Sequence, residues 1–471
     1  MVRSRQTTPI VNGSEGGRMK SINPTTGEVV AEYRDHSPAD LEAKLEASTR
    51  AFKDWRRRPF SERADLMRAA ADRLEARKDE FARLMAVEMG KPIAAGRAEV
   101  EKCAWVCRYY ADEAESMLAD RSIPTERTRS YLHHEPVGTV LAVMPWNFPF
   151  WQVFRFSAPG LMAGNTGVLK HASNVPGSAL AIEEVMTEAG FPEGVFTTLL
   201  IPGSAVDSVI EHPAIAAVTL TGSDPAGRSV AAKAGTMLKK TVLELGGSDP
   251  YLILADADLP TAAATCATSR LINGGQSCIA AKRFIMVEEI ADEFTDLFTA
   301  EMAKVDMADP LVESTKLGPQ ARHDLRDEVA DQVRRSVEAG ATLLLGGEVP
   351  QGPGAFYPPT VLARVEKGMP AYHEEIFGPA AALITVASEN EAVEVANDTQ
   401  FGLGAAVFSR DVERAERLAA ERIEAGCCFV NTFVASDPRL PFGGVKTSGY
   451  GRELSDLGIR EFVNQKTVVV A

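Results

Sequence analysis

Cysteine is scarce in this chain. Six cysteines in 471 residues are too few for a disulfide framework, and no two of them form a Cys-x-x-Cys pair. The seven histidines are scattered without the spacing of metal ligands. Cys103 and Cys107 share one face of an expected helix, where packing is favoured over a zinc site. The sequence therefore predicts neither a disulfide scaffold nor a metal centre.

Long apolar runs and an excess of positive charge are also missing. No apolar run approaches the roughly 18 residues of a membrane span, and residues 1–20 contain no apolar core of a secretory signal. The net charge of −15 repels nucleic acid and anionic membranes. We therefore expect a cytoplasmic protein without nucleic-acid or membrane partners, in which residues 1–20 form a polar arm.

The remaining composition is that of a globular protein, with length for roughly three domains or subdomains. Helical spacing follows Ser37, which is suited to cap a helix, and recurs up to Gly90. From Gly138 on, short apolar runs alternate with helical stretches, an order typical of a parallel sheet covered by helices. The expected strands are 140–143, 168–169, 217–220, 242–243, 251–254, 284–287 and 428–430, and the clearest helices are 179–189 and 226–234.

Two further segments, 131–134 and 467–470, have the composition of strands. An unpaired β-branched strand at the carboxyl end would be an edge prone to aggregation. We therefore expect the last segment to pair with another strand, and a neighbouring subunit is one candidate for that partner.

Cys278 ends an unusual segment, Asn-Gly-Gly-Gln-Ser-Cys, at residues 273–278. Glycines permit strained turns and let a ligand approach the backbone closely. A cysteine in such a turn is either a nucleophile beside backbone N–H donors or a buried, inert thiol. This segment alone leaves both interpretations open.

Three other segments place polar groups at the ends of expected strands, where α/β proteins keep functional groups. Glu244, followed by two glycines, is either such a group or a solvated turn acid. Asn147, within Pro-Trp-Asn-Phe-Pro, is suited to donate to an oxyanion or to cap a turn. Thr-Gly-Ser at 221–223 precedes a helix and could present N–H groups to phosphate, although it lacks the full dinucleotide fingerprint.

Together and in this order, these segments resemble the aldehyde dehydrogenase superfamily. The resemblance extends from Asn-Pro-Thr-Thr-Gly at 23–27, through Glu-Glu-Ile-Phe-Gly-Pro at 374–379, to Pro-Phe-Gly-Gly-Val-Lys-Thr-Ser-Gly at 441–449. It implies an α/β fold with a doubly wound NAD(P)-binding domain (21–117 and 138–246) and an α/β catalytic domain (247–446). It also implies a small β oligomerisation element (118–137 and 447–471) and a homodimer or homotetramer.

The resemblance implies oxidation of a small-molecule aldehyde to a carboxylic acid. Cys278 would attack the aldehyde carbon, while Asn147 and the Cys278 backbone N–H hold the oxyanion of the thiohemiacetal. Hydride transfer to nicotinamide would leave a thioester, and Glu244 would activate the water that hydrolyses it. This chemistry needs a thiolate, oxyanion donors and a carboxylate base, which these residue types can supply.

Cofactor residues follow from the same resemblance. Trp146 and Ser223 would flank the pyrophosphate, Lys170 would reach the adenosine ribose, and Glu375 would bind the nicotinamide ribose. The remaining implied cofactor residues are Gly222, in the turn before Ser223, and Phe377, beside the nicotinamide.

Ser173 bears on the choice of cofactor. Family members that prefer NAD often carry Glu at this position, three residues after the lysine, and that Glu would repel a 2′-phosphate. Ser173 can instead donate a hydrogen bond to the phosphate, and Lys170 supplies positive charge. We expect NADP to be preferred, with NAD as the alternative, while His171 replaces the usual proline with an unknown effect on the loop.

The segments 146–155, 170–176 and 275–284 look most like the NADP-dependent succinate-semialdehyde dehydrogenases. Succinate semialdehyde is therefore the expected substrate. Arg155 lies in an apolar stretch and would clamp the distal carboxylate, unless it forms a structural ion pair or lies at the rim. Ser436 would add a hydroxyl to the same carboxylate, and Arg439 and Arg283 are less favoured alternatives.

Other outcomes remain open. The substrate could be another aliphatic or ω-carboxylated aldehyde. Transfer of the acyl group to coenzyme A is a second possibility, against which Glu244 argues, because a hydrolytic base would waste the thioester. An inactive family member is a third, against which the presence of all the catalytic residue types argues.

Overall fold

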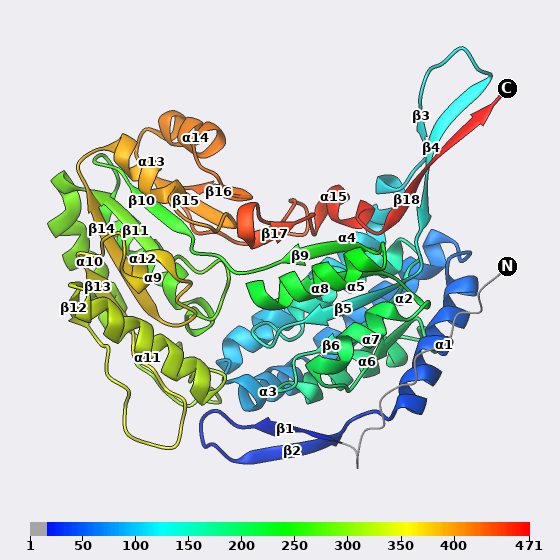
Figure 1. Ribbon diagram of the computed structural model, residues 1–471, viewed down its shortest axis with the longest axis horizontal. Coiled ribbons are helices and arrows are strands. Elements are labelled where there is room, and N and C mark those ends of the chain that lie inside the picture. The colour runs from blue at the N-terminus through cyan, green and yellow to red at the C-terminus, as the bar shows by residue number, and fades with distance from the viewer. Residues whose placement is uncertain (1–16) are drawn as a thin grey trace, which may run out of the picture.

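The computed structural model describes residues 17–471, so most of the expected polar arm lies outside the described residues. Two large β-sheets lie side by side, each covered by helices, and a narrow sheet projects from one end of the body (Figure 1). A hairpin of β1 (Arg18–Ile22) and β2 (Val29–Arg34) precedes the first helix. Residues 18–20 therefore belong to an ordered strand rather than to a loose arm.

Helices dominate the chain up to residue 117, as expected. Helix α1 (Pro38–Trp55) begins with a capping box in which the Asp40 N–H donates to Ser37 Oγ over 3.2 Å and the Ser37 N–H donates to Asp40. The next helical pattern divides at Arg77 into α2 (Phe60–Ala76) and α3 (Lys78–Met89). Gly90 ends α3 with a φ of 77°, and α4 (Ile93–Met117) follows.

The first large sheet has six strands in the order β17–β9–β8–β5–β6–β7. The pairings are parallel, except for that of β17 with β9. Its strands are β5 (Thr139–Met144), β6 (Thr166–His171), β7 (Phe196–Thr198), β8 (Ile215–Thr221), β9 (Lys240–Glu244) and β17 (Gly449–Tyr450). From β5 the chain winds outward to β7 and then returns to β8, so the strand order switches between β5 and β8, where such sheets bind ligands.

Both faces of this sheet are buried. Successive residues of β5, such as Leu141 and Ala142, contribute to different apolar clusters on opposite faces. One face is covered by α5 (Trp151–Met162) and α6 (Pro176–Glu188) with α2, α3 and α4, and the other by α1, α7 (Val206–Glu211) and α8 (Asp224–Thr236). This double cover confirms the doubly wound α/β fold.

The second large sheet has seven strands in the order β12–β13–β14–β11–β10–β15–β16, parallel except for β12. Its strands are β10 (Pro250–Ile253), β11 (Arg283–Val287), β12 (Thr342–Leu345), β13 (Thr360–Ala363), β14 (Ala380–Val386), β15 (Gly404–Phe408) and β16 (Cys427–Val430). Its helices are α9 (Leu259–Leu271), α10 (Ala291–Ala303), α11 (His323–Glu338), α12 (Pro370–His373), α13 (Glu389–Asn397) and α14 (Val412–Glu421). The expected strands of both large sheets are thus present.

The projecting sheet joins β18 (Val463–Val470), β4 (Arg129–Pro136) and β3 (Arg121–Ser122), and α15 (Ser455–Arg460) leads into it. Strand β18 pairs antiparallel with β4 along its whole length, from Val463 opposite Pro136 to Val470 opposite Arg129. The carboxyl-terminal strand therefore finds a partner within its own chain. The exact domain boundaries stay a prediction.

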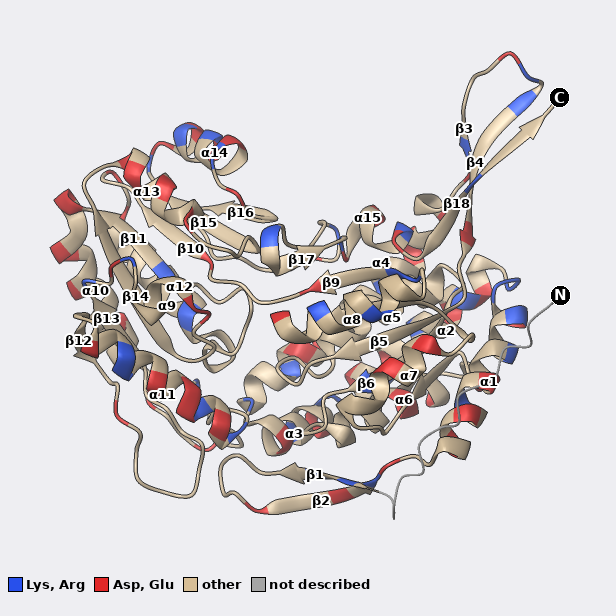
Figure 2. Ribbon diagram, in the orientation of Figure 1, with Lys and Arg blue, Asp and Glu red and all other residues tan. Residues whose placement is uncertain are grey.

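Charged residues of both signs are interspersed on the outer helices, as on α11 and α14 (Figure 2). No helix in residues 17–471 combines the length and apolar character that crossing a bilayer requires. Cys103 and Cys107 are fully buried in the apolar cluster around α4, which confirms that they serve as packing residues.

Candidate active site

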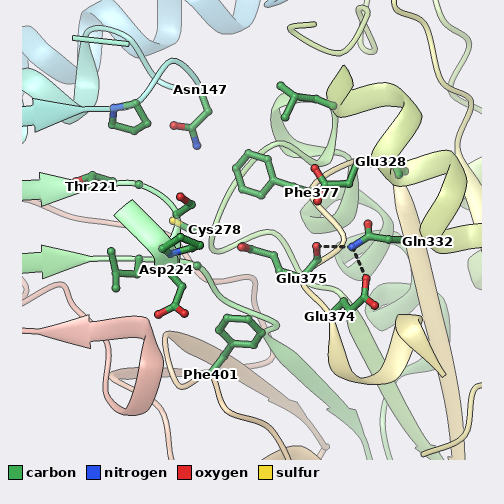
Figure 3. A pocket seen from close by; sticks show the side chains of 18 of the residues that line it. Asn147, Thr221, Asp224, Cys278, Glu328, Gln332, Glu374, Glu375, Phe377 and Phe401 are labelled. Carbon is green, nitrogen blue, oxygen red and sulfur yellow. Dashed lines mark hydrogen bonds between the residues drawn. The ribbon is translucent and has the colours of Figure 1, made fainter. Parts of the chain in front are cut away.

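A cavity of about 590 Å³ opens where the carboxyl ends of β5 and β8 face the loop that carries Cys278. Asn147 and Thr221 approach it from the six-stranded sheet, while Glu375 and Phe377 approach it from the other side (Figure 3). The cavity thus lies at the switch in strand order and joins residues that are far apart in sequence.

The backbone before Cys278 requires its glycines. Asn273, Gly274 and Gly275 have φ values of 52°, 66° and 75°, in the left-handed region. A Cβ on Gly275 would lie 2.1 Å from the carbonyl oxygen of Gly378. The motif therefore folds as a compact left-handed turn that delivers Cys278 to the cavity wall.

Side chains fix the carbonyl groups of this turn. Arg270 donates to the Gly275 carbonyl over 2.8 Å, and Lys282 Nζ donates to the carbonyls of Ser277 and Cys278 over 2.9 and 2.6 Å. Among residues 17–471, the Cys278 N–H makes no hydrogen bond. It is therefore available to a ligand oxygen.

Asn147 joins the first sheet to this turn. Its Nδ2 donates to the Gln276 carbonyl over 3.1 Å, and Asn273 Nδ2 donates to the Asn147 carbonyl over 2.7 Å. The structure thus places the side-chain amide of Asn147 beside the cysteine turn, where an amide N–H and a backbone N–H could bind one oxyanion.

The thiol of Cys278 faces the cavity but is largely surrounded by protein. Burial raises its pKa to about 12, while the positive charges of Lys282 and Arg155 act in the opposite direction. The nucleophilic thiolate is therefore scarce without a ligand, so a base or a bound ligand must favour it.

Glu244 ends β9 and is only 2% exposed. Its carboxylate oxygens make no hydrogen bond to the described residues, and it does not line the cavity in this conformation. Burial, and next the charge of Glu453, raise its pKa well above the usual value. A carboxyl group whose pKa is raised in this way is suited to exchange protons with water or substrate.

Most of the predicted cofactor residues surround the same cavity, namely Trp146, Gly222, Ser223, Glu375 and Phe377. The rings of Trp146 and Phe377 meet edge to face, with 5.8 Å between centroids. Ser223 stands at the N-terminus of α8, whose first N–H groups can receive an anion. Glu375 accepts a hydrogen bond from the Gly247 N–H over 2.9 Å and lies 3.5 Å from Lys282 Nζ.

Lys170 and Ser173 lie farther along the sheet. Ser173 is exposed at the wall of a second cavity, of about 670 Å³. Lys170 is the residue before the end of β6 and is 8% exposed, and no carboxylate in residues 17–471 pairs with it. A buried cation without a counterion is suited to an anionic group of a ligand.

His171 stabilises the turn after β5. Its Nδ1 accepts from the Ala172 N–H over 2.9 Å, and its Nε2 lies 2.9 Å from the Pro149 carbonyl. Burial lowers its pKa to about 4, so the ring is neutral and Nε2 donates. This contact fixes the segment that carries Asn147.

Arg155 does not line the first cavity. It is 2% exposed, forms an ion pair with Glu453, donates to Thr221 Oγ1 over 3.2 Å and stacks 4.9 Å from the centroid of Phe442. This environment corresponds to the structural ion pair that the sequence left open. The carboxylate clamp itself stays a prediction.

The other predicted substrate residues each have a different set of partners. Ser436 Oγ accepts a hydrogen bond from Lys102 over 2.8 Å, and Arg155 influences the pKa of that lysine. Arg283 instead donates to backbone carbonyls of Ser248, Val395 and Ala396. Arg439 is exposed and paired with Asp437.

Sequence reasoning missed three charged residues of this region, Lys102, Lys282 and Glu453. Lys102 lies three residues after Glu99, beside the buried face of α4, and Lys282 follows Cys278 by four residues. The sequence could have indicated both lysines, because Lys102 adjoins the apolar face of an expected helix and Lys282 follows the cysteine motif. No sequence pattern indicated Glu453, because its partner Arg155 is remote in sequence.

Comparisons with known proteins agree with this geometry. Residues 10–468 match the model of the "Aldehyde dehydrogenase family". The chain is 50% identical over 451 residues to a probable NADP-dependent succinate-semialdehyde dehydrogenase of Synechocystis, covering 96% of this chain and 99% of the relative. It is 51% identical over 452 residues to a succinate-semialdehyde dehydrogenase [NADP(+)] of Mycobacterium avium, covering 95% and 96%.

Among solved structures, the chain superposes on the succinic semialdehyde dehydrogenase of Streptococcus pyogenes, determined with NADP+. The TM-score is 0.94 at 40% identity, covering 96% of this chain and 99% of that one. The cysteine turn, the strand-end loops and these similarities lead to one conclusion: the chain belongs to the aldehyde dehydrogenase family.

Proposed function

We propose that this protein oxidises succinate semialdehyde to succinate, with NADP preferred over NAD as the hydride acceptor. The observation that carries the proposal is the meeting of Cys278, the Asn147 amide and the Gly222–Ser223 turn at one cavity. Relatives that are 50–51% identical over nearly the whole chain, and that are named for this substrate and cofactor, support it.

Cys278 is the nucleophile in this proposal. Its thiolate attacks the aldehyde carbon, and Asn147 Nδ2 with the Cys278 N–H stabilises the oxyanion of the thiohemiacetal. Bound NADP would accept the hydride that leaves this carbon. Glu244 then deprotonates the water that hydrolyses the Cys278 thioester. Since Glu244 does not line the cavity in this conformation, its side chain must rotate toward the thioester.

The residues present fit NADP. The cavity holds an aromatic edge, a helix N-terminus and the Glu375 carboxylate, which suit the nicotinamide, pyrophosphate and nicotinamide ribose respectively. Lys170, a buried cation without a carboxylate partner, and the exposed hydroxyl of Ser173 suit the adenosine ribose and its 2′-phosphate.

We further propose a cytoplasmic homodimer or homotetramer assembled through the projecting sheet. Strand β18 is an edge strand, and Val469 and Val470 are 54% and 41% exposed. An exposed strand edge with apolar residues at its end invites pairing with another copy. Light scattering coupled to size-exclusion chromatography tests this, and a monomer at micromolar concentration would refute it.

Initial rates of nicotinamide reduction test the enzymatic proposal. NADP and NAD are each combined with succinate semialdehyde and with uncharged butyraldehyde. We expect NADP with succinate semialdehyde to give the highest kcat/KM. Equal rates with butyraldehyde would overturn the substrate assignment and leave the family unaffected. Reduction that requires added coenzyme A would instead identify an acylating enzyme.

A further inference from the structure

Lys282 is a buried lysine whose ammonium group contacts the backbone on both sides of the nucleophile. Its side chain is 2% exposed, and its Nζ donates to the Ser277 carbonyl over 2.9 Å and to the Cys278 carbonyl over 2.6 Å. Glu375, which points from its own loop toward Cys278 (Figure 3), has its Oε1 atom 3.5 Å from the same nitrogen. The three N–H donors of an ammonium group match these three acceptors. Lys282 therefore joins the cysteine turn to the loop that carries Glu375.

The Ser277 carbonyl and the Cys278 N–H belong to one peptide unit, which is trans. In a planar trans peptide these two groups point in opposite directions, so a donor that holds the carbonyl also fixes the direction of the N–H. The Ser277 carbonyl accepts from Lys282 and, over 3.2 Å, from the Ala280 N–H, whereas the Cys278 N–H makes no hydrogen bond among residues 17–471. The peptide is thus held from its carbonyl side, and its N–H is left for a ligand oxygen.

The Cys278 carbonyl belongs to the next peptide unit, which Lys282 also holds. Gly247 packs closely against it, since a Cβ on Gly247 would lie 2.8 Å from this carbonyl oxygen. The Gly247 N–H donates in turn to Glu375 over 2.9 Å. When the peptide planes on both sides of a residue are held, its φ and ψ are held as well. Lys282 therefore fixes both the Cys278 N–H and the direction in which the thiol leaves the backbone.

Stability alone is a weak reason for this arrangement. Burying an ammonium group is costly, and a buried ion pair adds little net stability compared with apolar residues of similar volume. The two shortest contacts of Lys282 are to the carbonyls that flank the nucleophile, not to the carboxylate of Glu375. Lys282 also acts through its charge, because burial raises the pKa of the Cys278 thiol and the charge of Lys282 lowers it. The geometric and the electrostatic effect predict different kinetics.

We propose that Lys282 is a positioning residue for aldehyde oxidation, which holds the peptide between Ser277 and Cys278 so that its N–H faces the oxyanion of the thiohemiacetal. Asn147, the other proposed oxyanion donor, is tied to the same turn, because its Nδ2 donates to the Gln276 carbonyl over 3.1 Å. Both donors are thus oriented through carbonyl groups of one turn. This inference rests on the proposed function, since it requires Cys278 to be the nucleophile.

The test compares two reactions of Cys278 in Lys282→Met, a substitution of similar length that removes the N–H donors. Displacement of iodide from iodoacetamide needs the thiolate but forms no oxyanion. Attack on 4-nitrophenyl acetate, followed by release of nitrophenolate, needs the thiolate and passes through a tetrahedral oxyanion. At one pH we expect acylation to slow about tenfold or more beyond any slowing of alkylation, since loss of one oxyanion donor costs a factor of about 10² to 10³.

The matched control is Lys304→Met, because Lys304 is exposed and paired with Glu301 at the surface. It should change neither rate. Mass spectrometry of the Cys278 peptide confirms that alkylation and acylation occur at this cysteine.

Equal slowing of both reactions in Lys282→Met would mean that Lys282 acts only through the thiolate, and unchanged rates would mean that it does not act. Either result would overturn the inference. Should Lys282→Met fold poorly, Lys282→Leu, which also lacks a donor, is measured in the same way and judged by the same comparison. Neither reaction uses NADP or an aldehyde, so failure of the proposed substrate or cofactor is distinguished from failure of this inference.

Discussion

The buried and partly buried cations of this chain are of two kinds, which differ in their partners. Arg155 and Lys282 each meet a carboxylate of the protein, Glu453 and Glu375 respectively. Lys102 and Lys170 meet none in the described chain. Burying an uncompensated charge is costly. The paired cations therefore have their charge balanced within the protein, whereas the unpaired ones keep a charge that an anion could still compensate.

Among the substitutions considered, removal of the nucleophile Cys278 should have the largest effect on activity. We expect Cys278→Ala to lower kcat by a factor of about 10⁴ or more, as for other covalent nucleophiles, while NADP binding, measured by fluorescence titration, is retained. Cys428→Ala is the control and should retain activity. Substantial turnover by Cys278→Ala would refute the assigned nucleophile.

Arg155→Met tests the cations that are paired with a carboxylate of the protein. It leaves the Glu453 carboxyl buried without its partner, and we expect a loss of about 3 kcal/mol in stability, measured by urea denaturation. The double variant Arg155→Met, Glu453→Gln should recover much of this loss. Lys102→Met should cost far less. A stable Arg155→Met enzyme with a raised KM only for succinate semialdehyde would reassign Arg155 to substrate binding.

Glu244→Gln separates hydride transfer from hydrolysis. Without a base for the attacking water, steady-state turnover should fall by about a hundredfold or more. Rapid mixing should still show a burst of up to one NADPH per active site, because the thioester forms and then accumulates. Loss of the burst together with turnover would indicate that Glu244 acts before the thioester.

Lys170→Met tests the second unpaired cation and should have the smallest effect. We expect kcat/KM with NADP to fall about tenfold more than with NAD, because only NADP carries the 2′-phosphate. The control is Lys233→Met, since Lys233 is already paired with Glu211. Equal losses with both cofactors would place Lys170 away from the phosphate.

Much of the fold could be predicted because it is encoded locally. Apolar runs such as 140–143 mark strands, and Ser37 marks a helix start, since short-range periodicity and capping decide these elements. The division of one helical pattern at Arg77 was missed, because both helices bury apolar residues at the same spacing. The β1–β2 hairpin was missed because one of the two buried residues of β1 is Ser21, so the buried face of the strand has no apolar pattern.

The sequence motifs of the active site could be predicted, but the contacts between its side chains could not. Glycines before Cys278 indicate a strained turn, and the structure contains one. The pairing of Arg155 with Glu453 and the contact of Lys102 with Ser436 depend on tertiary packing across most of the chain. No local sequence pattern indicates which distant carboxylate will pair with a buried cation.

The last segments of the chain complete several distant parts of the molecule. Strand β17 closes the six-stranded sheet beside Glu244, Glu453 neutralises Arg155, and β18 pairs with β4. On the ribosome, where domains fold from the amino end, Arg155 lacks its counterion until Glu453 has been synthesised. Translation that stops early should therefore release a chain with an unfinished catalytic centre, and the point at which activity first emerges should coincide with the emergence of its final strands.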